Sequence, residues 1–288
     1  REGMANSVDV LFVDEAGQLS LIDTVAVSQA TKNMVLLGDP QQLKQPQQGS
    51  HPEGTEVSSL EHILKDNKTI PPEKGIFLDV TWRLHPQICS FISELFYESR
   101  LAAKPNLVSQ QLDGNTRFAG SGLWFIGIEH EGNQSSSTAA VAAVSALVSE
   151  LLKGNIFYTD NKNERAKLTA ADIKVIAPYN AQVNLLLSSL ADGIQVGTVD
   201  KFQGQEAPVV IFSMSTSTPE DAPRGMEFLY SLNRLNVAAS RAKSTFILVG
   251  NPKLFEPNCK SVEQMKLENA FCRFLEMINN IQIKSRYC

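Results

Sequence analysis

Residues 8–18 read VDVLFVDEAGQ, a largely apolar run that closes on two adjacent carboxylates, Asp14 and Glu15. The run predicts a β-strand over residues 8–13, which places the acid pair at the carboxyl end of that strand. There Asp14 is a candidate Mg²⁺ ligand, and Glu15 is a candidate base that orients and deprotonates a water molecule. Two acids at a strand end more often form a solvated turn or cap a helix, and this alternative stays open.

A phosphate-binding loop is the second half of the nucleotide sites in which such acid pairs occur. Its pattern, G-x-x-x-x-G-K-[ST], occurs nowhere in the 288 residues, and the chain contains no Gly-Lys dipeptide. We therefore expect the chain to begin within a domain, with the phosphate loop on a preceding part of the same polypeptide. The chain by itself is expected to bind nucleotide weakly and to turn over essentially none.

Composition narrows the class of protein and of partner. A hydrophobic content of 43% and a charged content of 20% are ordinary for a globular protein. The net charge of −5 provides no bulk positive field, so any nucleic-acid binding must be local. The four cysteines show no Cys-x-x-Cys pair, which argues against a zinc or iron–sulfur site. No apolar stretch is long enough to span a bilayer and no signal peptide is visible, so we expect a cytoplasmic protein without a membrane partner.

Short apolar runs alternate with helical patterns along the chain. Strands are predicted at residues 8–13, 33–38, 75–80, 122–128, 173–176, 195–199, 209–213 and 245–249. Helices are predicted at residues 85–100, 138–152, 180–190, 232–242 and 262–278, and loops at 102–121, 155–169 and 216–225. Continuous apolar strands followed by amphipathic helices are typical of an α/β fold whose parallel sheet is covered on both faces.

The Pro71-Pro72 pair interrupts this alternation and indicates a domain boundary near residue 75. Residues 1–75 hold only two predicted strands, too few for a doubly wound sheet. We therefore predict that residues 1–75 are the end of one α/β domain and that residues 76–288 form a second, complete one.

Six short motifs occur in the order of a known family. They are VDEAGQ (13–18), GDPQQL (38–43), TWRLHP (81–86), APYNAQ (177–182), TVDKFQGQE (198–206) and LNVAASRAK (235–243). They resemble motifs II, III, IV, IVa, V and VI of superfamily 1 helicases, in the branch that contains the RNA-surveillance and replication helicase–nucleases. The segments EFLYSLNRLNVAASRAK and VEQMKLENAFCRFLEM further resemble bacterial proteins that join a RecB-like nuclease to this helicase core.

This resemblance implies an architecture and an activity. The fold would be the RecA-like P-loop NTPase fold, with the tail of the first RecA-like domain at 1–75 and the second RecA-like domain at 76–288. ATP with Mg²⁺ would bind between the two domains and drive 5′-to-3′ movement on single-stranded DNA or RNA. The phosphate loop, with a RecB-like nuclease module, would lie upstream. The competing interpretation is a non-catalytic nucleic-acid- or protein-binding module with a helicase-derived fold.

The resemblance also assigns catalytic roles to residues of these motifs. Asp14 and Glu15 match the family's Mg²⁺ and water-handling acids, and Gln42, at the tip of the next strand, would sense the γ-phosphate. Arg83 and Arg241 match the arginines that reach the γ-phosphate with a planar fork of donors. Without the resemblance, Gln42 is a turn residue and Arg241 is a salt-bridged surface group. A structural role is expected for the neighbouring histidine, which would anchor the helix beside Arg83.

Three further residues would hold the nucleotide. Trp82 stands where the family usually has a tyrosine whose ring stacks on the base. Glu206 matches the residue that accepts a hydrogen bond from the ribose, and Gly204 lets the backbone approach a phosphate without a Cβ in the way. The alternatives are that Trp82 is a core residue and that Glu206 is a solvated loop residue.

Five residues are candidates for nucleic-acid contacts. Thr198 and Gln203 could touch the nucleic-acid backbone, and Lys201 could neutralise a phosphate. Tyr179 and Asn180 open a predicted helix, a placement that suits a backbone contact. The simpler interpretation is that Pro178-Tyr179-Asn180 only marks the start of a helix.

Overall fold

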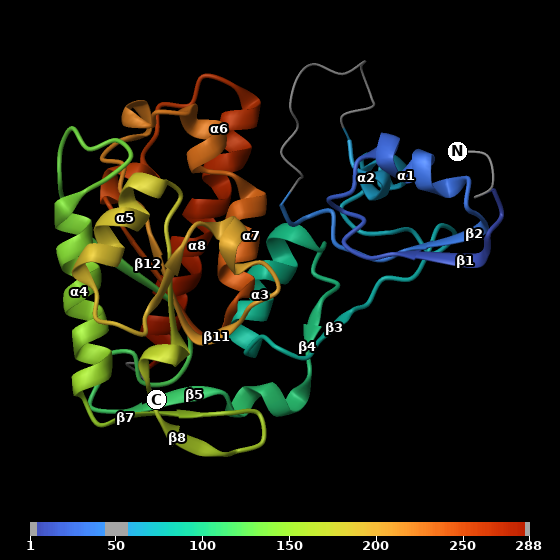
Figure 1. Cartoon of the computed structure of the whole chain (residues 1–288). Helices are drawn as coiled ribbons and strands as arrows, with labels where there is room; N and C mark the ends of the chain where they lie inside the picture. Colours follow the sequence, from blue (N-terminus) through green and yellow to red (C-terminus); the bar gives the residue numbers. More distant parts are fainter. Residues whose placement is uncertain (1–4, 44–56, 286–288) are drawn as a thin grey trace. The chain divides into compact units, whose positions relative to one another are not determined.

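The computed structural model describes residues 5–43 and 57–285, and the chain divides into two compact units (Figure 1). The first unit comprises residues 1–78 with 96–98, and the second comprises residues 79–95 with 99–288. The assignment of domains made from the sequence stays a prediction, because compact units are defined by contacts and not by independent folding.

The first unit is built on two parallel strands. Strands β1 (Val8–Val13) and β2 (Thr31–Leu36) pair with Val13 opposite Leu36. Two short helices accompany them, α1 (Leu21–Ser28) and α2 (Ser59–Leu64). Each begins at a serine whose side chain accepts a backbone N–H of the first turn, and α2 adds a reciprocal capping box. The sequence predicted both strands but neither helix, because segments of eight and six residues carry little periodicity.

Most of this first strand lacks the cover that the sequence predicted for both faces of a parallel sheet. Val8, Val10 and Phe12 are 45%, 43% and 66% exposed, whereas Val13 is buried. Alternate residues of a strand share one face, so the three exposed side chains form an apolar row on one side of β1. The small core of the unit contains Val13, Ala16 and Leu60. In the part of the chain that the structure describes, the face that carries Val8, Val10 and Phe12 is open to solvent.

A five-stranded parallel sheet is the centre of the second unit (Figure 1). Its spatial order is β10-β9-β11-β12-β6, and every neighbouring pair is parallel. The strands are β6 (Gly122–Gly127), β9 (Ile173–Ile176), β10 (Gln195–Gly197), β11 (Ala207–Ser213) and β12 (Ala242–Gly250). This sheet confirms the predicted α/β fold.

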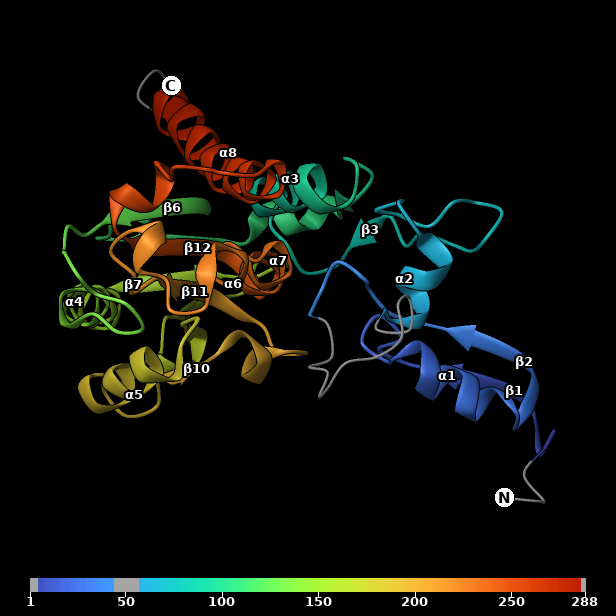
Figure 2. The same ribbon diagram turned by 90° about the horizontal axis from the view of Figure 1, so that it is seen from above.

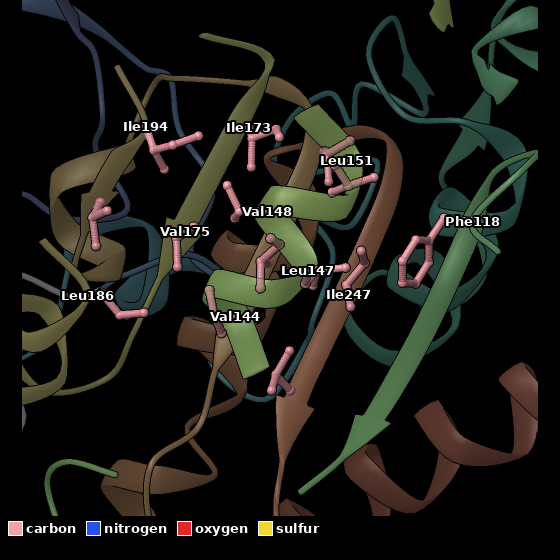
Figure 3. Packing of buried hydrophobic residues seen from close by; sticks show 14 of the residues in the cluster. Phe118, Val144, Leu147, Val148, Leu151, Ile173, Val175, Leu186, Ile194 and Ile247 are labelled. Atoms are coloured by element: carbon pink, nitrogen blue, oxygen red, sulfur yellow. The ribbon is translucent and has the colours of Figure 1, made fainter. Parts of the chain in front are cut away.

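One face of the sheet is covered by α4 (Thr138–Lys153) and α5 (Asn180–Ser189). Figure 3 shows Val144 and Leu147 of α4 directed at the sheet, where Ile247 lies. Each of the three residues is at most 1% exposed to solvent. Burial of whole aliphatic side chains contributes roughly 1.5–3 kcal/mol each relative to exposure.

The other face is covered by α3 (Pro86–Phe96), α7 (Leu232–Ser240) and α8 (Val262–Ser285), which lie together on that side in Figure 2. Phe274 of α8 joins these layers, because its ring lies 5.9 Å from Phe246 of the sheet and 5.5 Å from Phe91 of α3. The predicted double cover of the sheet is therefore confirmed. None of the described helices is long and apolar enough to cross a membrane.

A three-stranded antiparallel sheet lies where the sequence predicted loops. It has the order β5-β7-β8, formed by β5 (Gln111–Gly114), β7 (Ile156–Thr159) and β8 (Arg165–Lys167). Strands of three or four residues, of which β8 is fully exposed, show no apolar alternation that a sequence pattern could detect. The predicted strand at 75–80 is also wrong in extent, because only β3 (Val80–Thr81) forms, paired with β4 (Ala102–Ala103).

Candidate functional site

In the first unit, the ends of the two strands pack backbone against backbone. The N–H of Leu37 donates to the Val13 carbonyl and the N–H of Ala16 donates to the Leu37 carbonyl, each at 2.8 Å. A Cβ on Gly17 would lie 2.5 Å from the Asp39 carbonyl oxygen, so only glycine permits this approach. The predicted neighbourhood of the VDEAGQ and GDPQQL segments at the strand ends is therefore confirmed.

Asp14 and Glu15 are both exposed at this strand end. Asp14 Oδ1 accepts the Glu15 N–H at 2.9 Å, and Glu15 has a φ of +53°, in the left-handed region that non-glycine residues seldom adopt. An exposed carboxylate is a hard oxygen ligand of the kind Mg²⁺ prefers, so Asp14 fits the expected metal. Gln42 donates from its amide to Asp39 Oδ2 at 3.0 Å.

Glu206 and Arg241, which are assigned to nucleotide, lie at the opposite edge of the second unit's parallel sheet from Tyr179 and Thr198, which are assigned to nucleic acid. Glu206 and Arg241 directly precede β11 and β12, whereas Tyr179 follows β9 and Thr198 follows β10. All strands of the sheet are parallel, so their amino ends lie along one side of the sheet, here called the amino edge, and their carboxyl ends along the other, the carboxyl edge. The first pair lies at the amino edge and the second pair at the carboxyl edge. The sequence predicted the two sets of residues without predicting this separation.

At the amino edge, Glu206 is shared by two cations. Arg83 Nε donates to Glu206 Oε2 at 2.5 Å, and Lys243 Nζ lies 2.8 Å from Oε1. Burial raises the pKa of the Glu206 carboxyl, but the hydrogen bonds and charges of Lys243 and Arg83 outweigh it, so the pKa lies below the ordinary value. Glu206 is therefore no freely solvated loop residue. The sequence analysis missed Lys243, although it stands two positions after Arg241 in the same motif.

Arg241 is buried, with only 3% of its surface exposed. Its Nε donates to the Val237 carbonyl at 3.2 Å and its Nη2 to Ser240 Oγ at 3.5 Å, at the carboxyl end of α7. A cation in this place satisfies carbonyls that a helix end leaves without partners. The alternative of a surface position for this arginine is therefore wrong. Arg83 reaches the same helix end, because its Nη1 donates to the Ser240 carbonyl at 3.3 Å.

Trp82 and His85 flank Arg83 and differ sharply in exposure. Trp82 is 69% exposed, so the alternative of a core tryptophan is wrong, and the Lys104 ammonium lies 3.3 Å from its ring centroid. His85 is buried and contacts the Ser121 hydroxyl. Burial lowers the pKa of the His85 imidazole to about 4, so the ring is neutral at physiological pH.

At the carboxyl edge, Tyr179 is only 7% exposed and its ring lies 5.3 Å from that of Phe228. The guanidinium groups of Arg224 and Arg234 lie 4.0 Å and 4.4 Å from the Phe228 ring. Asn180, the next residue, is exposed at the start of α5. Of the two predicted contacts on this helix, Asn180 therefore has the accessible side chain and Tyr179 does not.

The segment from Thr198 to Glu206 leads from the carboxyl edge to the amino edge. Lys201 is exposed, and its ammonium donates to the Val196 carbonyl at 2.8 Å. Thr198 and Gln203 are half-buried. Gly204 has a φ of +74°, and a Cβ there would meet nothing within 4 Å, so this glycine is required by its backbone conformation and not by crowding within the chain. The ligand roles assigned to these residues stay predictions.

The fold and these residues define an α/β protein with a doubly covered parallel sheet. A family model described as "AAA domain" (AAA_12) matches residues 55–253, more than half of the chain, and the chain belongs to this family. It is 29% identical over 280 residues to "Putative helicase mov-10-B.2" of Danio rerio, covering 84% of this chain and 27% of that protein.

Two other relatives carry related names. The chain is 30% identical over 285 residues to "Probable RNA helicase armi" of Drosophila melanogaster, covering 85% of this chain and 23% of that protein. It is 30% identical over 269 residues to "DNA polymerase alpha-associated DNA helicase A" of Schizosaccharomyces pombe, covering 84% of this chain and 37% of that protein. The chain thus spans between 23% and 37% of the length of these three relatives. They support the resemblance to superfamily 1 helicases.

Proposed function

We propose that this chain is the C-terminal part of an ATP-dependent helicase or translocase that moves 5′-to-3′ on single-stranded DNA or RNA. The observation that carries the proposal is the cluster at the amino edge of the parallel sheet. There Arg83 and Arg241 meet at Ser240, beside Glu206. The ordered helicase motifs and the helicase names of the relatives give this cluster its proposed meaning.

In the proposed reaction the chain's residues act on the γ-phosphate of ATP. Asp14 would hold Mg²⁺, which when bound neutralises phosphate charge. Glu15 would orient the attacking water and accept its proton, and Gln42 would hydrogen-bond the γ-phosphate. Arg83 and Arg241 would stabilise the charge that develops on the transferred phosphoryl group. An arginine in this role is worth about 10³–10⁵ in rate, or roughly 4–7 kcal/mol of barrier.

Trp82 and Glu206 would hold the nucleoside, the first by stacking on the base and the second by accepting a ribose hydroxyl. The exposed ring of Trp82 supports its role, since a base can reach it. Gly204 would let the backbone approach a phosphate. The charged state of Glu206 suits an acceptor.

Nucleic acid would bind at the carboxyl edge and along the segment that follows β10, with Asn180, Thr198, Lys201 and Gln203 in contact with its backbone and Tyr179 supporting the surface. One relative is named an RNA helicase and another a DNA helicase. A motor that tracks the phosphate backbone needs no strong base readout, which leaves both substrates within the proposal. We also propose that a P-loop and a RecB-like nuclease module precede this chain in the polypeptide.

The test is ATP hydrolysis by the full-length protein with and without single-stranded DNA or RNA. Single strands should raise the ATPase rate, and a fluorescently labelled partial duplex with a 5′ overhang should be unwound. An ATPase rate that single strands leave unchanged would contradict the proposal. Binding of single strands without any hydrolysis would favour the non-catalytic binding module. The 288-residue chain alone should show no turnover, and measurable ATPase activity would refute that part.

A further inference from the structure

A buried glutamine connects the two cationic residues that share Glu206. Gln110 is 3% exposed, and its Nε2 donates to the Arg83 carbonyl at 2.7 Å and to the Lys243 carbonyl at 3.3 Å. Its Oε1 accepts a hydrogen bond from the Tyr158 hydroxyl at 2.8 Å. Both ends of the amide are therefore engaged, and each contact has a donor matched to an acceptor.

The carbonyls of Arg83 and Lys243 fix the orientation of this amide, because a carbonyl oxygen can only accept a hydrogen bond. A turned amide would set Oε1 against two carbonyl oxygens and leave the phenol facing an NH₂ group. Burial, followed by the charges of nearby acids, raises the pKa of the Tyr158 phenol, so it remains a hydrogen-bond donor at any physiological pH. In this orientation the hydroxyl donates to Oε1 and adds a third hydrogen bond that holds Nε2 toward Arg83 and Lys243.

The antiparallel sheet holds this pair together. Gln110 directly precedes β5, Tyr158 lies in β7, and Leu112 of β5 is paired with Tyr158 in the sheet. The pairing of β5 with β7 keeps the Tyr158 phenol within reach of the Gln110 amide. The Lys243 carbonyl also accepts the His85 N–H at 2.9 Å, so the segment that carries Arg83 is attached to the start of β12 a second time, two residues after Arg83.

We propose that Gln110 and Tyr158 are positioning residues that set the Arg83 backbone relative to Lys243, so that the Arg83 guanidinium stands at Glu206. The inference rests on the proposed function, because it is the ATPase role of Arg83 that gives the position its value. A displacement of about 1 Å in a catalytic group costs on the order of 100-fold in rate. A loosened backbone anchor should therefore lower kcat while leaving nucleotide binding nearly intact.

The test uses two variants of the full-length protein. Tyr158→Phe removes one hydroxyl, and Gln110→Glu keeps the shape of the side chain but replaces the donor by an acceptor. For Tyr158→Phe we expect kcat of the nucleic-acid-stimulated ATPase to fall about 3- to 10-fold, with the KM for ATP within about twofold of wild type. Gln110→Glu should lower kcat by a larger factor than Tyr158→Phe. Asp113→Asn is the matched control, since it breaks the Arg165–Asp113 pair of the same sheet and should leave kcat unchanged.

A second measurement separates this inference from the proposed function. In the 288-residue chain, the ¹⁵N–¹H resonance of Arg83 Nε reports its hydrogen bond to Glu206 without any catalysis. Tyr158→Phe should shift or broaden this resonance, and Asp113→Asn should not. Full-length wild-type protein without stimulated ATPase would sink the proposed function, whereas an unmoved Arg83 resonance in Tyr158→Phe would sink the positioning role. Wild-type kcat in Tyr158→Phe, beside a reduced kcat in an Arg83 variant, would also overturn the positioning role.

Discussion

Arg83 and Glu206 are joined by a hydrogen bond of 2.5 Å between Nε and Oε2, although 123 residues separate them in the chain. Lys243 occupies the other carboxylate oxygen at 2.8 Å. All three side chains remain about one third exposed, so the network lies at a surface that a ligand can reach. In the proposed reaction Arg83 acts on a phosphate, so it must exchange this carboxylate partner for the nucleotide.

Replacement of Arg83 by lysine tests the planar fork rather than the charge. Lysine keeps one positive charge but cannot give two parallel donors to a phosphoryl group. We expect Arg83→Lys to lower kcat of the full-length ATPase by at least about 100-fold, with little change in affinity for single strands. Arg165→Lys, at the exposed pair with Asp113, is the control and should retain wild-type kcat. Equal rates for the two variants would exclude a phosphate role for Arg83.

Removal of the Trp82 ring should affect nucleotide binding and not stability. The side chain is 69% exposed, so Trp82→Ala should leave the melting temperature nearly unchanged. Loss of a stacking contact of about 0.5–1.5 kcal/mol should raise the KM for ATP roughly 2- to 10-fold, and Trp82→Tyr should restore most of it. The measurement is ATPase kinetics of the full-length protein. A KM that stays at the wild-type value in Trp82→Ala would argue against base stacking.

Substitution of Gly204 can distinguish backbone strain from the loss of a contact with a ligand. A Cβ there meets nothing within 4 Å, so Gly204→Ala introduces no clash. It should lower the free energy of unfolding only through the strain of alanine in the left-handed conformation at φ +74°, by about 1 kcal/mol. Gly132 has a φ of +67° and equally open space, so Gly132→Ala should lose a similar free energy of unfolding in urea titrations. Only Gly204→Ala should weaken binding of single-stranded nucleic acid or of nucleotide. Equal binding by both variants would remove Gly204 from the site.

His85 predicts how stability depends on pH. Its folded-state pKa of about 4 lies below the ordinary value of 6.5, so the unfolded chain binds more protons between these two values. The free energy of unfolding should therefore decrease as pH falls from about 6.5 to 4, by on the order of 2–3 kcal/mol from this group.

The measurement is urea unfolding of the 288-residue chain at pH 7 and at pH 5. His85→Gln should flatten the decrease, while His62→Gln, at an exposed position on α2, should not. An unchanged pH slope in His85→Gln would show that the histidine is not buried in its neutral form.

Much of the parallel sheet could be predicted because its strands carry their own signal. Strand β9 is apolar except for Lys174 and is buried along its whole length, and its predicted bounds are those observed. The antiparallel sheet could not be predicted in this way, since β8 reads Arg-Ala-Lys and is exposed throughout. The sheet also requires β7 to pair with β5, which lies some forty residues earlier in the chain. No local sequence pattern encodes so distant a partner.

The sequence by itself determined the α/β class and the ordered motifs, because apolar periodicity and motif order are local properties of a chain. It also singled out Arg83, Glu206 and Arg241. Only the tertiary structure decided that Arg83 pairs with Glu206, that Arg241 is buried against the end of α7, and that Gln110 joins Arg83 to Lys243. These contacts link segments far apart in sequence, and they depend on how parallel strands align their amino ends, which no single segment specifies.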